Sequence, residues 1–384
     1  MKILFIHCRY KLAGGEDGVV LAEVELLRFN GIDVQLLPFS NEGSSLLKIF
    51  QLPFNISAYF KTRRYLKSFK PAIVHIHNLH FGATTSVLYA IKRQKIPVVI
   101  TLHNFRFLCP SGTLYHNNRP YLKSLKSNFP WAAVRDGVYN KSSLLTFWVA
   151  FSTWVNRLAG SYKIADRYIV LTSHAKSIIE NSSLHSGKSR IIIKPNFVYD
   201  PQVKNILRSD HFLFIGRLSA EKGISVLLEA FNNSSYSITI IGDGPLKGMV
   251  EEASENNANI NYLGYQQKDI IINELIKCSA LIFPSVWYET FGLTIIEAFA
   301  TSTAVIASNI GSPSILIKNG YNGFHFQDSN VNDLRNKLDI WQALKDDEKE
   351  FYRKNARDTY EQYYTPAENF QQLMSIYNAV TERK

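Results

Sequence analysis

The chain has 384 residues, of which 46% are hydrophobic and 20% are charged, so it is long enough for two globular domains and too apolar for a disordered protein. Its three cysteines, Cys8, Cys109 and Cys278, form no CxxC pair, which argues against a disulfide framework or a zinc site and favours a reducing compartment. The net charge of +11 is uneven, because residues 1–200 carry 26 Lys and Arg against 10 Asp and Glu, whereas residues 201–384 carry 17 against 22. This asymmetry predicts an anionic partner for the N-terminal half.

The first half of the chain alternates short apolar runs with helical patterns. The run at residues 3–6 predicts a buried strand and is too short for a signal peptide. Gly14-Gly15 then opens a helix that we expect from Val19 to Asn30, with a C-terminal signal at Asn30-Gly31. Further strands are predicted at residues 34–37, 73–76, 98–102 and 168–171. This alternation is typical of a doubly wound parallel sheet.

The pattern starts again after residue 200. Strands are predicted at residues 212–215, 238–241, 281–283 and 304–307, with a helix at 224–231 and an amphipathic helix at 367–380. We therefore expect an α/β fold of two Rossmann-like domains, residues 1–198 and 199–364, that face each other across a cleft. The C-terminal helix, residues 365–384, is expected to pack back on the first domain. In such sheets ligands bind at the carboxyl ends of the strands.

Two cations follow the first strand of the second domain. Arg217 and Lys222 lie five positions apart in the segment 216–223, where both side chains can converge on one diphosphate. The alternative is a pair of solvated surface cations. Two later turns, at residues 240–246 and at Leu263-Gly264-Tyr265, can bring the backbone close to a ligand or can simply shape the chain.

Two carboxylates, Glu289 and Glu297, lie eight positions apart between a strand end and an apolar helix. Any helical part of this segment would bring both acids toward one face, and the helix start between them can receive a phosphate. Both acids lie among Phe, Leu, Ile and Ala, so a binding role is favoured over a solvated helix face. The pattern suggests a bound sugar nucleotide.

The order of these motifs resembles the retaining glycosyltransferases of family 4, which have the GT-B fold and use nucleotide-sugar donors without a bound metal. The resemblance implies that Arg217 and Lys222 hold the donor diphosphate, that Glu297 binds the ribose and that Glu289 binds the transferred sugar. It also implies substrate-binding roles for Asn196, Gly216, Gly244, Tyr265, Phe291, Gly292, Leu293 and Thr294. The match is densest between residues 212 and 324.

The N-terminal half carries the same resemblance. Gly14-Gly15 is similar to the glycine loop that lies over the donor phosphates, and His103 is similar to the active-site histidine that contacts the donor sugar. The alternative for His103 is a histidine that caps a strand. A set of metal ligands is one interpretation of the three histidines His75, His77 and His80. Their alternation along a strand and the lack of a nearby carboxylate favour structural roles.

Motifs of other enzyme classes are missing, and parts of the family pattern are altered. The sequence contains no Asp-x-Asp, no P-loop and no G-x-G-x-x-G, which argues against metal-dependent glycosyltransferases, kinases and standard NAD enzymes. Residues 302–305 read Ser-Thr-Ala-Val where the family usually has Gly-x-Pro-Val. Ser314 stands where the family usually has an acid, a change that affects one expected donor contact.

Two segments rich in basic and aromatic residues indicate the surface from which the protein would reach its acceptor. Residues 46–67 mix apolar and aromatic residues with cations only, and residues 123–163 place Trp131, Trp148 and Trp154 among Lys and Arg. Together they favour contact with an anionic membrane surface over ordinary core aromatics with a solvated basic face. A nucleic-acid partner is disfavoured because no binding motif accompanies the charge.

We therefore expect a retaining hexosyltransferase-type enzyme of cell-envelope or exopolysaccharide synthesis, with a nucleotide-sugar donor, a glycan or lipid-linked acceptor and no metal cofactor. The longest apolar run, residues 144–151, is too short to span a bilayer, so we expect a cytoplasmic protein that is either soluble or peripherally attached to the inner face of the membrane. The alternatives are a sugar-nucleotide epimerase on the same fold and a non-catalytic nucleotide-sugar-binding subunit.

Overall fold

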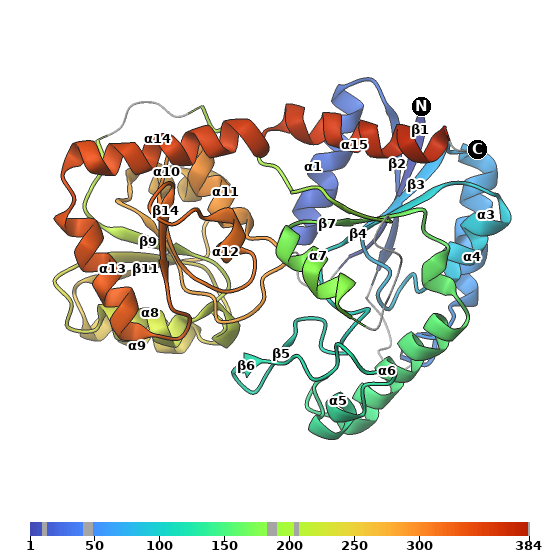
Figure 1. Ribbon diagram of the computed structural model, residues 1–384, viewed down its shortest axis with the longest axis horizontal. Helices are drawn as coiled ribbons and strands as arrows, with labels where there is room; N and C mark the ends of the chain where they lie inside the picture. The colour runs from blue at the N-terminus through green and yellow to red at the C-terminus, as the bar shows by residue number, and fades with distance from the viewer. Residues whose placement is uncertain (10–13, 41–48, 183–189, 203–206, 383–384) are drawn as a thin grey trace. The chain divides into compact units, whose positions relative to one another are not determined.

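The computed structural model describes residues 1–9, 14–40, 49–182, 190–202 and 207–382 (Figure 1). The chain forms two compact units. The first unit comprises Met1–Leu114, Tyr121–Pro195 and Asn369–Lys384, and the second comprises Tyr115–Pro120 and Asn196–Glu368. The C-terminal segment therefore belongs to the same unit as the N-terminus.

A six-stranded parallel sheet with the order β2-β1-β3-β4-β7-β8 forms the centre of the first unit. Its strands are β1 (Lys2–Arg9), β2 (Asp33–Ser40), β3 (Ile73–Ile76), β4 (Val98–Leu102), β7 (Arg167–Val170) and β8 (Ile191–Ile193). The helices are α1 (Gly15–Phe29), α3 (Ile56–Phe69), α4 (Ser86–Arg93), α5 (Trp131–Asp136), α6 (Ser143–Leu158), α7 (Ser173–Glu180) and α15 (Pro366–Thr381). A short hairpin, β5 (Tyr115–His116) and β6 (Arg119–Pro120), is grouped with the second unit.

Period-two alternation decides what each face of this sheet contacts. Ile3 and Phe5 of β1 and Ile73 of β3 are buried in one cluster with apolar residues of α1 and α15. From α15 this cluster takes Leu373, Ile376, Tyr377 and Val380. The last helix thus completes the core of the first unit by covering one face of its sheet (Figure 1).

The second unit repeats the design with the strand order β11-β10-β9-β12-β13-β14. Its strands are β9 (Phe212–Ile215), β10 (Ile238–Ile241), β11 (Ile260–Gly264), β12 (Leu281–Phe283), β13 (Val305–Ser308) and β14 (Gly323–Phe326). Its α-helices are α8 (Ile224–Phe231), α9 (Lys247–Asn256), α10 (Lys268–Lys277), α11 (Leu293–Ala300), α12 (Pro313–Leu316), α13 (Val331–Ala343) and α14 (Asp346–Tyr363). Trp341 of α13 is fully buried in its core, where its indole N–H donates to Ser279 Oγ over 2.9 Å.

The predicted fold class, two doubly wound parallel sheets, is confirmed. Five strands among the described residues were not predicted, because polar residues or glycines interrupt their apolar runs; they are the hairpin strands β5 and β6 and the sheet strands β8, β11 and β14. The first helix begins at Gly15 and not at Val19, since Gly14 is already its N-cap. Among the described residues, no helix combines the length and the apolar character that crossing a bilayer requires.

Candidate active site

Each sheet has a point where its strand order reverses, and ligands of doubly wound sheets bind there. In the second unit this point lies between β9 and β12, which are adjacent in the sheet. The chain leaves β9 through the loop with Arg217 and Lys222 and leaves β12 through the loop with Glu289. Four of the predicted site residues, these three and Glu297 of α11, therefore lie on the two segments that follow the reversal point.

Close backbone contacts hold these loops together. A Cβ on Gly223, which has a φ of +74°, would lie 1.9 Å from the carbonyl oxygen of Pro284. A Cβ on Gly242 would lie 1.9 Å from the carbonyl oxygen of Gly216. The Val286 N–H also donates to the Glu221 carbonyl over 2.9 Å. Only glycine fits at the first two positions, and the loops after β9, β10 and β12 are thereby fixed against one another.

Lys222 and Glu289 form an ion pair across these loops. The side chain of Glu289 is 9% exposed and that of Lys222 is 23% exposed, so water screens the pair only in part. Ser285 Oγ donates to the same carboxylate over 3.0 Å, and the Lys222 ammonium lies 5.6 Å from the centre of the Trp287 ring. The two residues, to which the sequence assigned separate roles, are therefore parts of one polar centre.

The segment after β13 supports Glu289 from its backbone side. Ser312 donates from Oγ to the Glu289 carbonyl over 2.6 Å and from its N–H over 3.2 Å. Gly311 has a φ of +65°, and a Cβ there would lie 2.8 Å from the Glu289 nitrogen. Ser314, which replaces the expected acid, donates to the Gly311 carbonyl over 2.7 Å and so stabilises this turn. The altered family motif still positions the first of the two acids.

Arg217 and Glu297 are the two charged groups of this region that remain available to a ligand. Arg217 is exposed, and its guanidinium makes no hydrogen bond or ion pair with the residues that the structure describes. Glu297 is half-buried on α11, and its carboxylate is likewise without a hydrogen bond or ion pair in the described chain. Burial raises the pKa of Glu297, and Lys268 opposes this shift. An unpaired acid in such surroundings is a candidate for binding hydroxyl groups.

The remaining positions predicted for the donor lie in different environments. Glu289 precedes α11, which begins at Leu293, so the two acids do not share one helix. Phe291 is buried and contacts the Tyr364 ring, which leaves only its backbone for a ligand. Gly292 has a φ of +118° and is the N-cap residue of α11, so that the free N–H groups of the first turn, at Leu293 and Thr294, follow it.

Three further predicted positions lie in turns after strands of the second unit, and a fourth, Asn196, lies where this unit begins. Gly244 follows β10 with a positive φ, and Gly216 precedes Arg217 directly after β9. Tyr265 follows β11 and is 78% exposed, so its ring is accessible for stacking on a planar base. Asn196 is buried at the start of the second unit, where its Oδ1 has no hydrogen-bond partner within the described residues.

In the first unit the strand order reverses between β1 and β3. Gly14 lies after β1, and a Cβ there would meet no atom of the described residues within 4 Å. Its N–H donates to Asp17 Oδ2 over 3.1 Å, and Asp17 Oδ1 lies 2.7 Å from His7 Nε2. Gly14-Gly15 thus starts a helix that is held to the end of β1. The fold itself does not require a glycine at position 14, which is consistent with close approach of a ligand.

His103 directly follows β4 at the same edge of the sheet. Its Nε2 lies 2.9 Å from Nδ1 of His77, which directly follows β3, and the two rings are stacked with centroids 5.2 Å apart. Burial lowers the pKa of His103 well below the usual value of a histidine, and the charge of His77 adds to this shift, so His103 is neutral at pH 7. Both rings line a pocket together with Asn104, Arg106 and Asn156.

His75 and His80 differ in their surroundings: both ring nitrogens of His75 have hydrogen-bond partners, whereas Nε2 of His80 is buried without one among the described residues. His75 makes two hydrogen bonds: Nδ1 lies 2.7 Å from the Tyr377 hydroxyl oxygen, and Nε2 lies 2.8 Å from Thr101 Oγ1. His80 contacts the Phe81 ring, with centroids 4.6 Å apart. The structural interpretation of His75 agrees with these contacts, since both ring nitrogens serve to join β3 to β4 and to α15.

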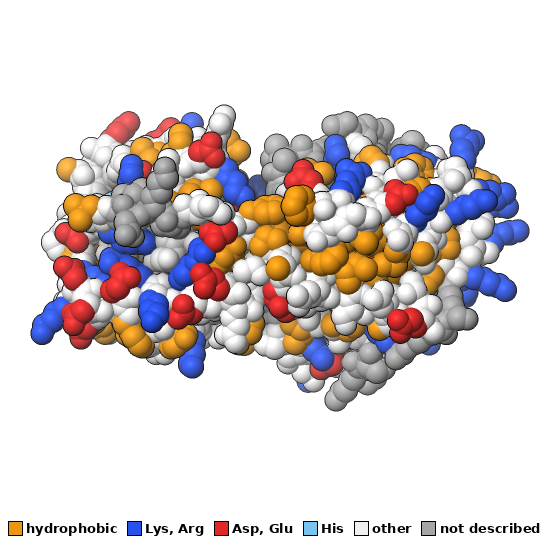
Figure 2. Space-filling model, turned by 90° about the horizontal axis from the view of Figure 1, so that it is seen from above, with side chains coloured by type: hydrophobic (Ala, Val, Ile, Leu, Met, Phe, Trp, Pro, Cys, Tyr) orange, Lys and Arg blue, Asp and Glu red, His pale blue; other side chains and the backbone are white. Residues whose placement is uncertain are grey.

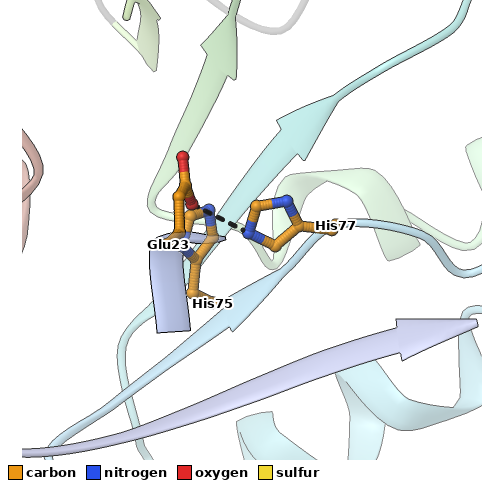
Figure 3. Close-up of side chains that lie close together, drawn as sticks. All are labelled: Glu23, His75 and His77. Carbon is orange, nitrogen blue, oxygen red and sulfur yellow. Dashed lines mark ion pairs between the residues drawn. The ribbon is translucent and has the colours of Figure 1, made fainter. Parts of the chain in front are cut away.

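The sequence analysis missed the carboxylate of this histidine group, because it comes from a distant helix. Glu23 of α1 meets His75 and His77 so closely that one ligand atom of each lies within 4.8 Å of the others (Figure 3). This spacing would suit a metal ion, but Lys194 Nζ lies 2.6 Å from Glu23 Oε1 and supplies the positive charge. The signal in the sequence was a lone acid among the apolar positions of α1 and a lysine after three isoleucines.

Comparison with known proteins agrees with the fold. Residues 200–359 match the family model of group 1 glycosyl transferases, and residues 42–198 match that of glycosyltransferase family 4. The chain belongs to this family of glycosyltransferases.

Particular proteins extend the comparison. An uncharacterized glycosyltransferase of Methanocaldococcus jannaschii is 29% identical over 50% of this chain, which spans 55% of that protein. Alpha-monoglucosyldiacylglycerol synthase of Acholeplasma laidlawii is 27% identical over 73% of this chain and 68% of its own length. Among solved structures, Anabaena HepE in complex with UDP superimposes with a TM-score of 0.68 over 99% of this chain and all of its own, at 17% identity, which shows a shared fold.

Proposed function

We propose that this protein is a retaining glycosyltransferase that moves a sugar from a nucleotide-sugar donor to a glycan or lipid-linked acceptor in cell-envelope or exopolysaccharide synthesis. The observation that carries the proposal is the polar centre at the strand reversal of the second unit. There the Lys222–Glu289 pair, the unpaired Arg217 and the unpaired Glu297 offer two cations and two hydroxyl-binding acids. A diphosphate, a ribose and a sugar need these groups.

The cations account for the chemistry of the leaving group. When the bond between the sugar and the diphosphate breaks, negative charge develops on the phosphate, and Arg217 and Lys222 would stabilise it. We propose that these side chains make a metal cofactor unnecessary. Glu289 is held by Lys222 and Ser285 and so is poorly placed as a nucleophile, which supports attack on the same face with the leaving phosphate taking the acceptor proton.

The relatives support the substrate classes without fixing them for this chain. The name of the Acholeplasma enzyme describes an α-linked glycolipid, and HepE was solved with UDP. We propose a uridine nucleotide as the first donor class to test. The acceptor would be bound by the first unit, whose pocket beside His103 is lined by polar side chains such as Asn104 and Asn156.

Contact with an anionic membrane is the second part of the proposal, and it would place the protein at the inner face of the cell membrane. The two basic segments meet in the structure through residues that are 99 positions apart in sequence. Trp148 Nε1 of α6 donates to the Ile49 carbonyl over 2.5 Å, and the Trp148 and Phe50 rings lie 6.1 Å apart. Residues 46–48 of the first segment lie outside the described residues.

Around this junction the first unit exposes large apolar side chains beside cations. Its exposed apolar residues near α3, α5 and α6 are Phe50, Phe54, Ile56, Phe60, Trp131, Leu144 and Leu158. The α3 helix contributes exposed Lys61, Arg64 and Lys67 and contains no acid. Lys and Arg side chains gather at the end of the first unit that carries α3 (Figure 2). Apolar groups within a cationic rim suit the interface of an anionic bilayer.

Nucleotide release separates the transferase from its alternatives. With each of several UDP-, GDP- and ADP-sugars and a mixture of bacterial lipid-linked glycans, a transferase frees nucleotide only when an acceptor is present. An epimerase would change the sugar without release, and a binding subunit would do neither. Arg217→Ala and Glu289→Ala should each reduce release by at least about 100-fold, whereas Lys337→Ala on α13 should leave it unchanged. Unaltered release in both site variants would refute the assignment.

A further inference from the structure

The loop after β4 holds an arginine in a fixed place close to His103 in the sequence. The Phe105 N–H donates to the Gly112 carbonyl over 2.8 Å and closes the loop, and the Arg106 N–H donates to Asn104 Oδ1 over 3.0 Å. Gly112 has a φ of +75°, and a Cβ there would lie 3.0 Å from Nη2 of Arg106. Glycine at this position therefore lets the guanidinium of Arg106 lie directly against the loop.

Two more contacts position the Arg106 guanidinium. Nη1 donates to the Pro110 carbonyl over 3.3 Å, and the central carbon atom Cζ lies 5.7 Å from the centre of the Tyr139 ring. The charge of Arg106 acts inside the pocket that the acceptor is proposed to enter, because His80 in the wall of that pocket responds to it. Burial lowers the pKa of His80 well below its usual value, and the charge of Arg106 lowers it further.

A second pocket of the first unit adjoins this one, and the two share Arg106 and Thr153 in their walls. The second pocket is formed by α6 and by the loops after β4 and before α5, and Arg157 also lines it. Arg157 donates over 3.4 Å from Nη1 to the Asn128 carbonyl and over 3.4 Å from Nη2 to the Phe107 carbonyl. Two guanidinium groups, each with main-chain carbonyls among its acceptors, therefore meet one cavity.

The two pockets have a one-sided charge. No carboxylate lines either of them among the residues that the structure describes, whereas Arg106 and Arg157 keep their charges at pH 7. Burial lowers the pKa of Arg157, and Tyr162 opposes this shift, so the surroundings disfavour the charged form. An anion in the second pocket would offset this cost, because a guanidinium forms short, charge-assisted hydrogen bonds with anionic oxygens.

We propose that Arg106 and Arg157 bind the phosphate groups of the acceptor, which is then a saccharide linked through a diphosphate to a lipid or to a soluble group, and not a neutral glycolipid. The inference rests on the proposed function in one respect, that the pocket beside His103 receives the acceptor. Two cations at one pocket match the two or more negative charges of a diphosphate, whereas the carboxylate of an acidic sugar supplies one. Because the pockets share Arg106, a diphosphate in the second pocket leaves the first pocket for the saccharide.

The test measures the binding of two probes, inorganic pyrophosphate and farnesyl diphosphate, by isothermal titration calorimetry at physiological ionic strength. The full-length protein carries Arg217→Ala/Lys222→Met in every sample, so that the proposed donor site does not take up the probes. We expect this protein to bind both probes. The further change Arg106→Gln/Arg157→Gln should weaken binding by about 100-fold, because the loss of charge-assisted hydrogen bonds costs about tenfold for each arginine.

The chain offers matched controls for this loss. Lys92→Gln/Arg93→Gln on α4 removes the same charge from exposed positions of the same unit and should leave binding unchanged. If the double arginine variant does not fold, Thr153→Asp serves instead, because its carboxylate in the wall shared by both pockets competes with the probes for the arginines. Thr153→Asn is the uncharged counterpart and should bind both probes as strongly as the protein with Thr153 does.

Three results would overturn the inference: no binding of either probe, equal weakening in the control that changes Lys92 and Arg93, or competition by glucuronate as strong as that by pyrophosphate. Tighter binding of farnesyl diphosphate would indicate a lipid-linked source of the phosphate, and tighter or equal binding of pyrophosphate would indicate a soluble one. Because the titrations involve no turnover, they are independent of the proposed activity. Failure of nucleotide release together with binding that depends on the two arginines would refute the function and leave the phosphate site standing.

Discussion

Lys222 and Glu289 form an ion pair although 67 residues separate them in the chain. The pair exists because β9 and β12, which precede the two loops, are neighbours in the sheet while β10 and β11 lie on the other side of β9. A strand reversal of this kind is where doubly wound sheets bind ligands. The contact joins the proposed diphosphate cation to the proposed sugar-binding acid.

Variants of the Lys222–Glu289 pair should show different effects on stability and on activity. Lys222→Met leaves the Glu289 carboxylate, 9% exposed, without its cation and should lower the free energy of unfolding by about 1–3 kcal/mol. Lys222→Met/Glu289→Gln removes both charges and should recover most of that loss, while nucleotide release stays absent in both variants. Urea denaturation of the two variants measures this coupling. Equal instability of the single and double variants would argue against an energetic role of the pair.

Glu297 should limit stability at neutral pH. Burial raises the pKa of this carboxyl above its usual value of 4.5, so between that value and the higher native value the folded state holds more protons than the unfolded state. Stability therefore falls as pH rises through this window, and the penalty is fully present above it. Glu297→Gln should raise the midpoint of thermal unfolding at pH 7, give no gain at pH 3.5 and weaken donor binding.

Scanning calorimetry at the two pH values, with and without UDP, checks both effects of Glu297→Gln. The control is Glu251→Gln on α9, an exposed acid that pairs with Lys247 and should not stabilise the protein. A Glu297→Gln protein that is stabilised equally at both pH values would contradict the burial argument. Undiminished stabilisation of the Glu297→Gln protein by UDP would contradict the ribose assignment.

Gly223 should tolerate no side chain. An alanine there has a φ of +74° and a Cβ 1.9 Å from the Pro284 carbonyl oxygen, so the loop that carries Lys222 must move. We expect Gly223→Ala to cost at least about 2 kcal/mol and to weaken nucleotide binding. Gly248→Ala on α9 is the matched control, because its Cβ would meet nothing within 4 Å and alanine favours a helix by about 0.5–1 kcal/mol. Guanidinium denaturation of both variants gives the comparison.

Charge reversal on α3 should release the protein from anionic vesicles. Each basic residue near an anionic surface contributes about 1 kcal/mol, so Lys61→Glu/Arg64→Glu/Lys67→Glu should reduce binding by more than about 100-fold. Flotation with vesicles that contain phosphatidylglycerol measures it at low salt. The matched control reverses three exposed lysines of the second unit, Lys277, Lys345 and Lys354, and should bind like the unaltered protein. Equal loss in both proteins would indicate a response to net charge alone.

Local pattern was sufficient for much of the fold. Strands β3, β4, β9, β10 and β12 and helix α8 were predicted at their observed bounds, because short apolar runs next to glycine turns leave few alternatives. The position of Arg217 and Lys222 in the loop after β9 could be predicted for the same reason, since residues that follow a buried strand lie at the carboxyl edge of a parallel sheet. Membership of the family followed from the order of the motifs.

Only the tertiary structure decided how distant residues share a site. Glu23 and Lys194 are ordinary acid and base in the sequence, but their burial against each other follows from α1 crossing the sheet beside the segment after β8. Likewise Glu289 gains Lys222, Ser285 and Ser312 through the strand order and not through spacing along the chain. Sequence periodicity specifies which face of a strand or helix is apolar, whereas the charge partner of a buried group is set by which elements pack together.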